Sequence, residues 1–390
     1  MDKVVIIEAK RTPIGKLNGI LHDLTAEQLG TLAVKNVLKN GHVSPDSIDQ
    51  VIFGNAIQAG NGQNIARQIE LNSGIPQDRT AFTVNQVCGS GMQAIHQAQS
   101  ALRLGEASMI VAGGTESMSN APYLNMDQRR ATKFGSITIE DALEHDGLRD
   151  SLSGIMMGAT AENIATQFNV SRESQDQFAY RSHQHAITAT RNHHFDNEIV
   201  PITQVGRADP IMADEPIRFD TTMTKLNHLK PAFKANGSVT AGNSAGLNDG
   251  ASALLLTTTA HAKALGIQPL AEIIGYSETG IDPKIMGYAP YLAMKKLLNQ
   301  LKMTISDIDL VELNEAFAAQ CVAVIRDLHL PMDKVNISGG AIALGHPLGD
   351  SGARIVTTLI NNLKQTKQEI GIASLCMGGG MGSALAIKLI

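Results

Sequence analysis

The chain has 390 residues, a formal net charge of −5 and a hydrophobic share of 43%. This length allows two or three domains with a sizeable core, and the charged share of 18% is typical of a globular protein. Because the net charge is small and like charges form no block, we expect neither nucleic acid nor an acidic membrane surface as a partner. No apolar run approaches the roughly 20 residues that span a bilayer.

The cysteine content and the first residues bear on the compartment. The chain contains three cysteines, and an odd number in a long chain favours a reducing compartment over a disulfide framework. The first residues predict a strand and a turn rather than a signal peptide. We therefore expect a cytoplasmic protein.

Strands and helices alternate along the first part of the chain. Residues 4–8 predict the first strand, and Thr25 to Gln28 form a capping box that opens a helix ending before Gly41. The next predicted elements are a strand at 51–54, a helix at 62–73 and a strand at 109–112. This alternation predicts an α/β layer with a largely parallel sheet.

The strongest local signal surrounds Cys88, in the stretch TVNQVCGSGMQA. Residues 83–87 predict a buried strand, residues 92–104 predict a helix, and the small residues between them predict a turn with close backbone approach. Cys88 lies at this turn, where the helix N terminus favours a thiolate, which is a nucleophile. Two other interpretations are open at this point: a buried apolar cysteine, and a dinucleotide-binding turn with Glu116 as the ribose-binding acid.

The C-terminal part repeats the order of the N-terminal part. SIDQV ending at Val51 matches DIDLV ending at Val311, CGSGMQAI matches GDSGARIV, and each part has a strand that ends in glycines. The offsets are all close to 260 residues, which indicates a duplicated fold. The region between the two parts, residues 119–249, is too long for a connection and predicts an inserted domain.

Three stretches of the C-terminal part combine polar side chains with tight glycine turns. Asn314 begins NEAFA where a strand meets a helix, His346 lies in the loop GGAIALGHPLGDSG, and Cys376 begins CMGGGMG. An isolated asparagine is most often a helix cap and an isolated loop histidine a surface residue. Glycine N–H groups beside a thiol also suit an oxyanion, however, and the three stretches together indicate a catalytic site.

The chain resembles the thiolase family along essentially its whole length, and within that family the acetyl-CoA C-acetyltransferases. The stretches that carry the resemblance are VVIIEAKRTPIG, NQVCGSGM, GGTESMSNAPY, NEAFA, GHPLG and CMGGGMG. The resemblance implies a thiolase-like α/β fold, with duplicated five-stranded halves in α-β-α-β-α layers and an inserted loop domain. The expected division is an N-terminal half of residues 1–118 with 250–271, an inserted CoA-binding loop domain of residues 119–249, and a C-terminal half of residues 272–390.

The resemblance also implies a ping-pong Claisen condensation of two acetyl-CoA molecules to acetoacetyl-CoA and CoA, and the reverse thiolysis. Cys88 carries the acyl group, His346 activates Cys88 and protonates the departing CoA thiolate, and Cys376 removes the α-proton of the second acetyl-CoA. Asn314, through a water, and His346 stabilise the enolate oxygen, and the N–H groups of Cys88 and Gly378 form the oxyanion hole. No cofactor and no metal are expected, and the family implies a homotetramer or a homodimer.

The implied substrate contacts come from the inserted region and the C-terminal half. They are Leu148, Met157, Arg218, Phe233, Ala241, Ser244, Met286, Ala316 and Phe317. For any single apolar residue among them, ordinary core or loop packing is an equally good explanation. The positions of Met157 and Met286 favour short acyl groups, and a broader-chain 3-ketoacyl-CoA thiolase of fatty acid degradation is the alternative.

Three residues depart from the family's pattern. Asp350 replaces a small residue, commonly Ala, and puts a carboxylate near the thiols, whose pKa it would raise. Met156 replaces a common histidine, and Ala245 stands where many relatives have a serine that contacts CoA. We expect these changes to affect substrate affinity and turnover while leaving the chemistry intact.

A serine hydrolase is the main rival from another class. GNSAG satisfies G-x-S-x-G with Ser244 as the nucleophile, and Asp309 and His346 follow in the required order. The elbow requires a helix directly after the serine, however, and residues 248–250 intervene. A NAD-dependent dehydrogenase leaves both cysteines of the matching halves unexplained. A non-catalytic thiolase-like protein is disfavoured because no catalytic position is lost.

Overall fold

The structure is a computed structural model that describes residues 2–130, 133–204 and 209–390. Within these residues the main sheet has ten strands. They are β1 (Val4–Arg11), β2 (Gly15–Lys16), β3 (Gln50–Gly54), β4 (Thr80–Val84), β5 (Met109–Ser117), β8 (Asn248–Thr258), β9 (Ala271–Gly280), β10 (Leu310–Leu313), β11 (Ile370–Met377) and β12 (Met381–Leu389). A separate hairpin pairs β6 (Tyr123–Leu124) with β7 (Glu140–Asp141).

The α-helices are α1 (Ala26–Asn40), α2 (Ile65–Asn72), α3 (Ser90–Leu104), α4 (Met157–Gln167), α5 (Arg172–Arg191), α6 (Met223–Asn227), α7 (Thr259–Leu265), α8 (Ala289–Leu301), α9 (Ala318–Asp327), α10 (Ala341–Leu344) and α11 (Ser351–Thr366). The predicted bounds of α1, α2 and α3 agree with the structure to within three residues. The predicted capping box of α1 is present, because the Thr25 hydroxyl accepts from the Gln28 N–H and the Gln28 side chain accepts from the Thr25 N–H.

The sheet is mixed, and the expectation of a largely parallel sheet is wrong. The strand order is β10-β11-β12-β9-β1-β8-β5-β3-β4. Only the pairs β3–β4, β3–β5 and β10–β11 of this path are parallel. The hairpin between β11 and β12 can only be antiparallel. Strand β8 returns from the inserted region and lies antiparallel between β1 and β5.

The strand order of the N-terminal half is repeated in the C-terminal half, except that the fifth strand of the C-terminal half is missing among the described residues. The order β4-β3-β5-β8-β1 has its counterpart in β10-β11-β12-β9, and the fifth strand is replaced by a single parallel bridge from Val311 to Val335. The next residue, Asn336, has a left-handed φ of +47°, which ends the extended backbone. Its side-chain amide instead takes the strand's place, accepting from the Leu313 N–H and donating to the Leu313 carbonyl, both at 2.8 Å.

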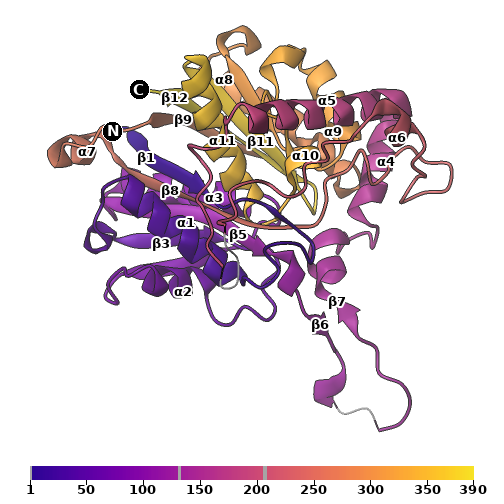
Figure 1. The fold of residues 1–390 in the computed structure, drawn as a ribbon, viewed down its shortest axis with the longest axis horizontal. Coiled ribbons are helices and arrows are strands. Elements are labelled where there is room, and N and C mark those ends of the chain that lie inside the picture. The colour runs from indigo at the N-terminus through magenta and orange to yellow at the C-terminus, as the bar shows by residue number, and fades with distance from the viewer. Residues whose placement is uncertain (1, 131–132, 205–208) are drawn as a thin grey trace.

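Helices and sheets alternate in the five layers that the resemblance implies (Figure 1). Helices α1 and α2 cover the outer face of the N-terminal half, α8 and α9 cover that of the C-terminal half, and α3 and α11 lie between the halves. Strand β3 shows why helices cover both faces of the sheet. Successive side chains of a strand point to opposite faces, so both faces of this strand need a partner. Val51 and Phe53 pack with α1 and α2, whereas Ile52 packs with α3 and α11.

Glycines allow α3 and α11 to meet at their N termini. A Cβ on Gly352 would lie 2.4 Å from the Met92 backbone nitrogen, and one on Gly91 would lie 3.0 Å from the Gly349 carbonyl oxygen. Only glycine permits such an approach of backbone to backbone. The two turns that carry Cys88 and His346 therefore come together across the boundary between the halves.

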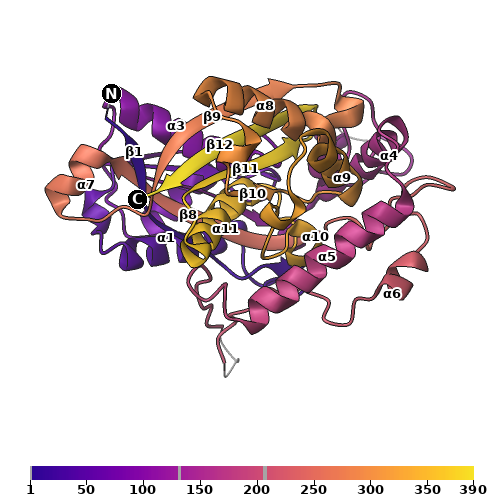
Figure 2. The same cartoon turned by 90° about the horizontal axis from the view of Figure 1, so that it is seen from above.

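The region between β5 and β8 forms an arm and a cover. Its β6–β7 hairpin is the start of an arm that projects from the body (Figure 1), and α5 packs along α9 and α10 (Figure 2). Arg11 of β1 anchors this region through buried ion pairs with Glu198 at 2.6 Å and Asp214 at 2.7 Å. Among the described residues, no helix is both long enough and apolar enough to cross a membrane.

The glycine contact predicts a stability difference. Gly352→Ala should lower the free energy of unfolding by about 1–3 kcal/mol, because overpacking a close contact forces the backbone to shift. Gly280→Ala is the matched control, since its Cβ would meet nothing closer than the Gly380 carbonyl oxygen at 3.8 Å. Urea unfolding measures both variants, and equal stabilities would contradict the close approach of α3 and α11.

Candidate active site

A small internal cavity brings most of the predicted site residues together. Its volume is about 60 Å³. It is lined by Cys88, Gly147, Leu148, Met157, Ala245, Gly246, Leu247, Met286, Ala316, Phe317, His346, Leu348 and Cys376. The N-terminal half, the inserted region and the C-terminal half all contribute, so the cavity forms only when all three are folded together.

The turn before α3 holds Cys88 in this cavity. Strand β4 ends at Val84 and not at residue 87 as predicted, because the chain turns sharply at Val87. This residue has a φ of +50°, a conformation that β-branched residues rarely adopt. Ser90 holds the turn, since its hydroxyl donates to the Val87 carbonyl at 2.6 Å and accepts from the Gln86 N–H at 2.9 Å. The strained backbone therefore places Cys88 directly before the helix.

The surroundings of Cys88 oppose the thiolate that the helix N terminus was expected to favour. Burial raises the pKa of the Cys88 thiol to about 12, against the effect of the N–H groups of Gly378 and of Cys88 itself, and the Glu116 carboxylate adds to the increase. The expectation of a ready thiolate is therefore wrong. The two N–H groups near the sulfur are those that the resemblance assigns to the oxyanion hole, and Gly378 follows the end of β11.

His346 is a neutral base at rest. Burial lowers the pKa of its imidazole to about 3, and the Arg354 guanidinium contributes to the decrease. Its Nδ1 lies 2.5 Å from the Ser351 hydroxyl, whose own proton goes to the Pro347 carbonyl at 2.8 Å. Because Ser351 has already donated its proton, it accepts from Nδ1–H and leaves the lone pair on Nε2. This Nε2 is buried and has no partner among the described residues.

Cys376 is the third polar residue of the cavity lining, whereas Asn314 is not among the lining residues. Asn314 follows β10 but does not cap α9, whose N-cap is Phe317, so the helix-cap interpretation is wrong. Both polar atoms of the Asn314 amide are buried without a partner in the described part of the chain, and a buried amide requires a water or a ligand. Burial raises the pKa of the Cys376 thiol, and the neighbouring Cys88 raises it further. Cys376 is therefore a thiol at rest.

Seven of the predicted substrate contacts lie in or directly behind the cavity wall. Those that line it are Leu148, Met157, Met286, Ala316 and Phe317. Phe233 packs edge-on against Phe317 with ring centroids 6.1 Å apart, and Ser244 forms a β-bridge with Phe317.

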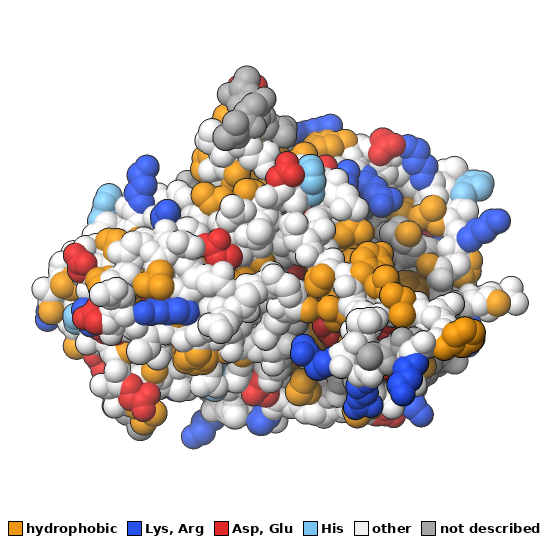
Figure 3. All heavy atoms as spheres, turned by 90° about the horizontal axis from the view of Figure 1, so that it is seen from below, with side chains coloured by type: hydrophobic (Ala, Val, Ile, Leu, Met, Phe, Trp, Pro, Cys, Tyr) orange, Lys and Arg blue, Asp and Glu red, His pale blue; other side chains and the backbone are white. Residues whose placement is uncertain are grey.

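Arg218 and Ala241 lie elsewhere. Both are exposed, and Arg218 lines a second hollow of about 460 Å³ together with Lys225 and His228. On the face drawn in Figure 3, hydrophobic side chains gather in the right half, and Lys and Arg side chains stand around them. A face of this kind suits a ligand that joins an apolar arm to phosphate groups.

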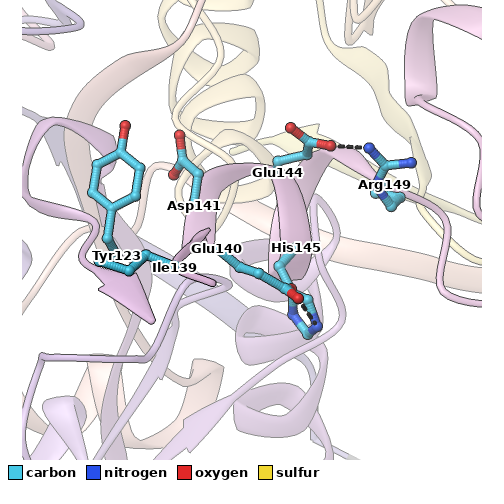
Figure 4. A pocket seen from close by; sticks show the side chains of 7 residues that line it. All are labelled: Tyr123, Ile139, Glu140, Asp141, Glu144, His145 and Arg149. Atoms are coloured by element: carbon cyan, nitrogen blue, oxygen red, sulfur yellow. Dashed lines mark hydrogen bonds and ion pairs between the residues drawn. The ribbon is translucent and has the colours of Figure 1, made fainter. Parts of the chain in front are cut away.

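The hollow where the arm leaves the body is larger than the hollow lined by Arg218, but its charged groups suit an anion less well (Figure 4). Its volume is about 560 Å³, and it is lined by Tyr123, Ile139, Glu140, Asp141, Glu144, His145 and Arg149. The two cationic groups are already paired, Arg149 with Glu144, and His145 with Glu140 at 3.6 Å. The carboxylates disfavour phosphate, so the size of this hollow does not make it the substrate site.

The departures from the family's pattern fall at three different places. Ala245 lines the cavity and donates its N–H to the Ala316 carbonyl at 3.0 Å, and Met156 is the N-cap residue of α4. Asp350 is buried at the start of α11. The acid that acts on the Cys88 thiol is Glu116 and not Asp350, so the expectation that Asp350 raises the pKa of the thiols is not supported.

Glu116 is the important site residue that the sequence analysis assigned to the wrong role. Its Oε1 accepts from Asn55 Nδ2 at 2.8 Å and from the Ile57 N–H at 3.2 Å. Its Oε2 accepts from the Ala56 N–H at 3.0 Å and from the Gly349 N–H at 2.8 Å. A carboxylate with four donors cannot bind a ribose, so the dinucleotide interpretation is wrong. Instead, it ties the loop of His346 to the N-terminal half.

The serine hydrolase interpretation is also wrong. The Ser244 hydroxyl donates to the Thr240 carbonyl at 2.7 Å, and the chain continues into β8 rather than into a helix. The Asp309 carboxylate accepts from the Ile370 N–H at 2.9 Å and makes no hydrogen bond with His346. Neither side chain has the contacts of a catalytic triad.

The remaining cysteine lies outside the cavity, and the described residues hold no metal site. All three cysteines are free, and Cys321 is buried in α9 outside the cavity lining, as predicted for a small apolar residue. Within the residues that the structure describes, no group of three or more His, Cys, Asp or Glu side chains has metal-binding geometry.

Comparisons with known proteins decide the family. The family model of the thiolase N-terminal domain matches residues 4–260, and that of the thiolase C-terminal domain matches residues 267–389. The chain belongs to the thiolase family. This thiolase is therefore an acyltransferase, and its five-layer architecture is the thiolase fold.

The relatives of this thiolase include two named activities. It is 47% identical to a probable acetyl-CoA acyltransferase of Staphylococcus epidermidis and 46% identical to one of Staphylococcus aureus, over 100% of the chain and 99% of each relative. Two solved structures cover 100% of the chain and 99% of their own with TM-scores of 0.97. They are the Bacillus anthracis acetyl-CoA acetyltransferase at 45% identity and human mitochondrial 3-ketoacyl-CoA thiolase at 42% identity.

The hydrogen bond from His346 to Ser351 generates a prediction. In Ser351→Ala, Nδ1–H loses its acceptor, and the imidazole loses its fixed tautomer. We expect acetylation of Cys88 by acetyl-CoA to slow by about 10- to 100-fold, within the ~10²–10⁴-fold that a positioned base contributes. The KM should not change, because Ser351 does not line the cavity.

Rapid-quench acetylation followed by peptide mass spectrometry measures this rate. Ser100→Ala is the control, since it removes a half-buried hydroxyl that bonds only the His96 carbonyl of α3. A wild-type acetylation rate in Ser351→Ala would show that the tautomer is fixed by other means.

Proposed function

We propose that this thiolase condenses two acetyl-CoA molecules to acetoacetyl-CoA and CoA, and catalyses the reverse thiolysis, through an acyl-Cys88 intermediate. The observation that carries the proposal is the small cavity whose lining includes Cys88, His346 and Cys376. Two thiols and a neutral imidazole around one small space suit acyl transfer followed by proton removal from carbon. The relatives named acetyl-CoA acyltransferase and acetyltransferase support acetyl-CoA as the acyl donor.

The first half-reaction makes the acyl-enzyme. Because the pKa of Cys88 is high and that of His346 is low, the thiol proton moves to Nε2 only as the sulfur attacks the thioester carbonyl. The N–H groups of Cys88 and Gly378 receive the oxyanion. The C–S bond to CoA then breaks and leaves acetyl-Cys88. Splitting the condensation in this way gives ping-pong kinetics.

Cys376 transfers a proton in two successive steps. Cys376 is a thiol at rest, so it must lose a proton before it can take one from carbon. The departing CoA thiolate is a suitable acceptor, and in this scheme Cys376 takes over the protonation of CoA that the resemblance assigns to His346. The Cys376 thiolate then removes the α-proton of the second acetyl-CoA. His346, still holding the proton of Cys88, and a water on Asn314 stabilise the enolate oxygen. The enolate attacks the acetyl group, and Cys88 leaves with the proton of His346.

This cycle requires CoA thioesters and no further cofactor, because every proton moves between residues and substrates. The CoA chain would run from the cavity past Phe233 and Ser244 toward Ala241 and Arg218. The exposed position of Arg218 suits a contact with the polar end of CoA. The free thiols agree with the proposed cytoplasmic location.

We propose further that the molecule is a homotetramer, with a homodimer as the alternative. Among the described residues, the arm from β6 to β7 exposes several large hydrophobic side chains. They are Tyr123, Met126, Phe134, Ile137 and Ile139. A patch of this kind on a projecting segment is typical of a protein–protein contact.

The division of labour between the thiols predicts different outcomes for two variants. Cys88→Ala should abolish acyl transfer. Cys376→Ser should still form acetyl-Cys88, because His346 can return its proton to CoA, but condensation should fall by ~10²–10⁴-fold for want of the base. Exchange of the α-protons of bound acetyl-CoA with deuterated water gives the direct measurement, and Cys376→Ser should not exchange them. Wild-type exchange in this variant would refute the role of Cys376.

The small cavity predicts a preference for short acyl groups. Wild type should cleave acetoacetyl-CoA faster than medium-chain 3-ketoacyl-CoA, because the cavity that Met157 and Met286 help to line has a volume of only about 60 Å³. Met157→Ala should raise kcat/KM for the medium chain relative to acetoacetyl-CoA by about tenfold. The control is Met212→Ala, at an exposed position. Equal rates across chain lengths in wild type would favour the broader-chain 3-ketoacyl-CoA thiolase, which the human relative supports.

A further inference from the structure

Asp350, which departs from the residue common in the family, is buried where the two halves meet. It is 1% exposed at the N-cap position of α11, and neither carboxylate oxygen has a hydrogen-bond partner among the described residues. A Cβ on Gly250 would lie 3.5 Å from its Oδ2, so the carboxylate faces β8. Ser252 of the same strand faces this carboxylate: its buried hydroxyl makes no hydrogen bond of full geometry, but the hydroxyl and the N–H of Ser252 both lower the pKa of Asp350. A buried carboxylate requires a counter-charge or water.

Arg354 lies one turn further along α11 and is buried to the same degree. None of its three guanidinium nitrogens has a hydrogen-bond partner in the described part of the chain. Residues four apart share one face of a helix, so Asp350 and Arg354 project to the same side. The positive charge of Arg354 lowers the pKa of Asp350, although the two form no direct ion pair.

Other charged groups lie near this pair. Those that interact with Asp350 or Arg354 are Arg11 of β1, Glu116 of β5, Glu198 of the inserted region, Glu312 of β10, Glu315 and His346. Arg11 is paired with Glu198 and Asp214, and Glu116 is held by four N–H donors. Glu312 Oε2 lies 3.9 Å from Arg354 and raises the pKa of Arg354 more than any other charge, while burial raises the pKa of Glu312 itself to about 8. Asp350, which also raises the pKa of Arg354, is therefore a second acid beside Glu312.

We propose that Asp350 is a second counter-charge of Arg354, beside Glu312 and bridged to Arg354 by water, and that it makes His346 a stronger base toward the Cys88 thiol. Asp350 is thus a positioning residue that acts through Arg354. An unbalanced Arg354 opposes a second positive charge on the imidazole, and the carboxylate offsets this opposition. In the step concerned, the S–H bond of Cys88 breaks, the proton moves to His346 Nε2, and the sulfur bonds to the attacked carbon.

Alkylation of Cys88 by iodoacetamide tests this role without an acyl-CoA. The sulfur bonds to carbon, iodide leaves, and His346 takes the thiol proton. Although the role of His346 rests on the proposed function, this assay does not, and acetylation of wild-type Cys88 by acetyl-CoA tests that function separately. The rate at Cys88 is followed by peptide mass spectrometry in wild type, Asp350→Ala and Asp350→Asn. Asp350→Ala introduces the residue common in the family, so the fold should tolerate it.

The expected result depends on pH in a defined way. Burial raises the pKa of Asp350 to about 7, so the carboxylate is charged above this pH and neutral below it. Well above pH 7 both variants should be alkylated about threefold to tenfold more slowly than wild type. This is the size of effect expected when one charge is removed from the neighbourhood of a reacting group. Well below pH 7 the three rates should converge. The exposed Asp333→Asn controls for loss of a negative charge and should match wild type throughout.

Two results would overturn the proposal. Rates equal to wild type at high pH would mean that Asp350 does not act on the Cys88–His346 pair. Faster alkylation of the variants at high pH would mean that the carboxylate opposes the Cys88 thiolate and does not assist His346.

Discussion

The site depends on one carboxylate that joins the two halves of the molecule. Glu116, at the end of β5, receives N–H groups from the loop after β3 and from Gly349 in the loop of His346. The contact between the N termini of α3 and α11 lies beside it, at distances that only glycine allows. Cys88 and His346 come from different halves, so their separation is set by this tie. The same carboxylate raises the pKa of Cys88, so structure and reactivity are linked through it.

Burial explains why the reactive groups are neutral at rest. The thiol and the imidazole are both buried, so water does not stabilise the charged form of either group. Burial therefore raises the pKa of Cys88 and lowers that of His346. The cost is a weaker nucleophile before substrate binds. The gain is that hydrogen bonds to the developing oxyanion act in a low dielectric, where they are strongest. The hydrogen bond between His346 Nδ1 and Ser351 keeps the lone pair of the resting imidazole on Nε2.

The sequence predicted those parts of this arrangement that depend on local patterns. The capping box of α1, the helix after Cys88 and the repeat of strand-turn-helix units each follow from residues near one another in the chain. Strand β4 and the fifth strand of the C-terminal half could not be placed in this way, because Val87 and Asn336 break the extended backbone through left-handed φ angles. Val gives no signal for such a conformation, and Asn, although it is enriched among left-handed residues, gives a weaker signal than glycine.

The candidate site was predicted by residue type but not by electrostatics. The motifs identified Cys88, His346 and Cys376, and the cavity brings them together. The roles of Glu116 and Asp350 were misjudged, because a carboxylate's effect depends on which donors and charges the fold places around it. Ser351 gave no signal of its own, since a serine at the start of a helix is common.

The central claim is that burial keeps Cys88 a thiol until a substrate arrives. Ultraviolet absorbance of the thiolate, titrated in wild type and in Cys88→Ala, tests it most directly. The difference between the two proteins should show no thiolate at neutral pH, and should show one only as the pH approaches the raised pKa of about 12. A Cys88 thiolate at neutral pH would contradict the account, because Cys88 and His346 would then form an ion pair in the resting enzyme.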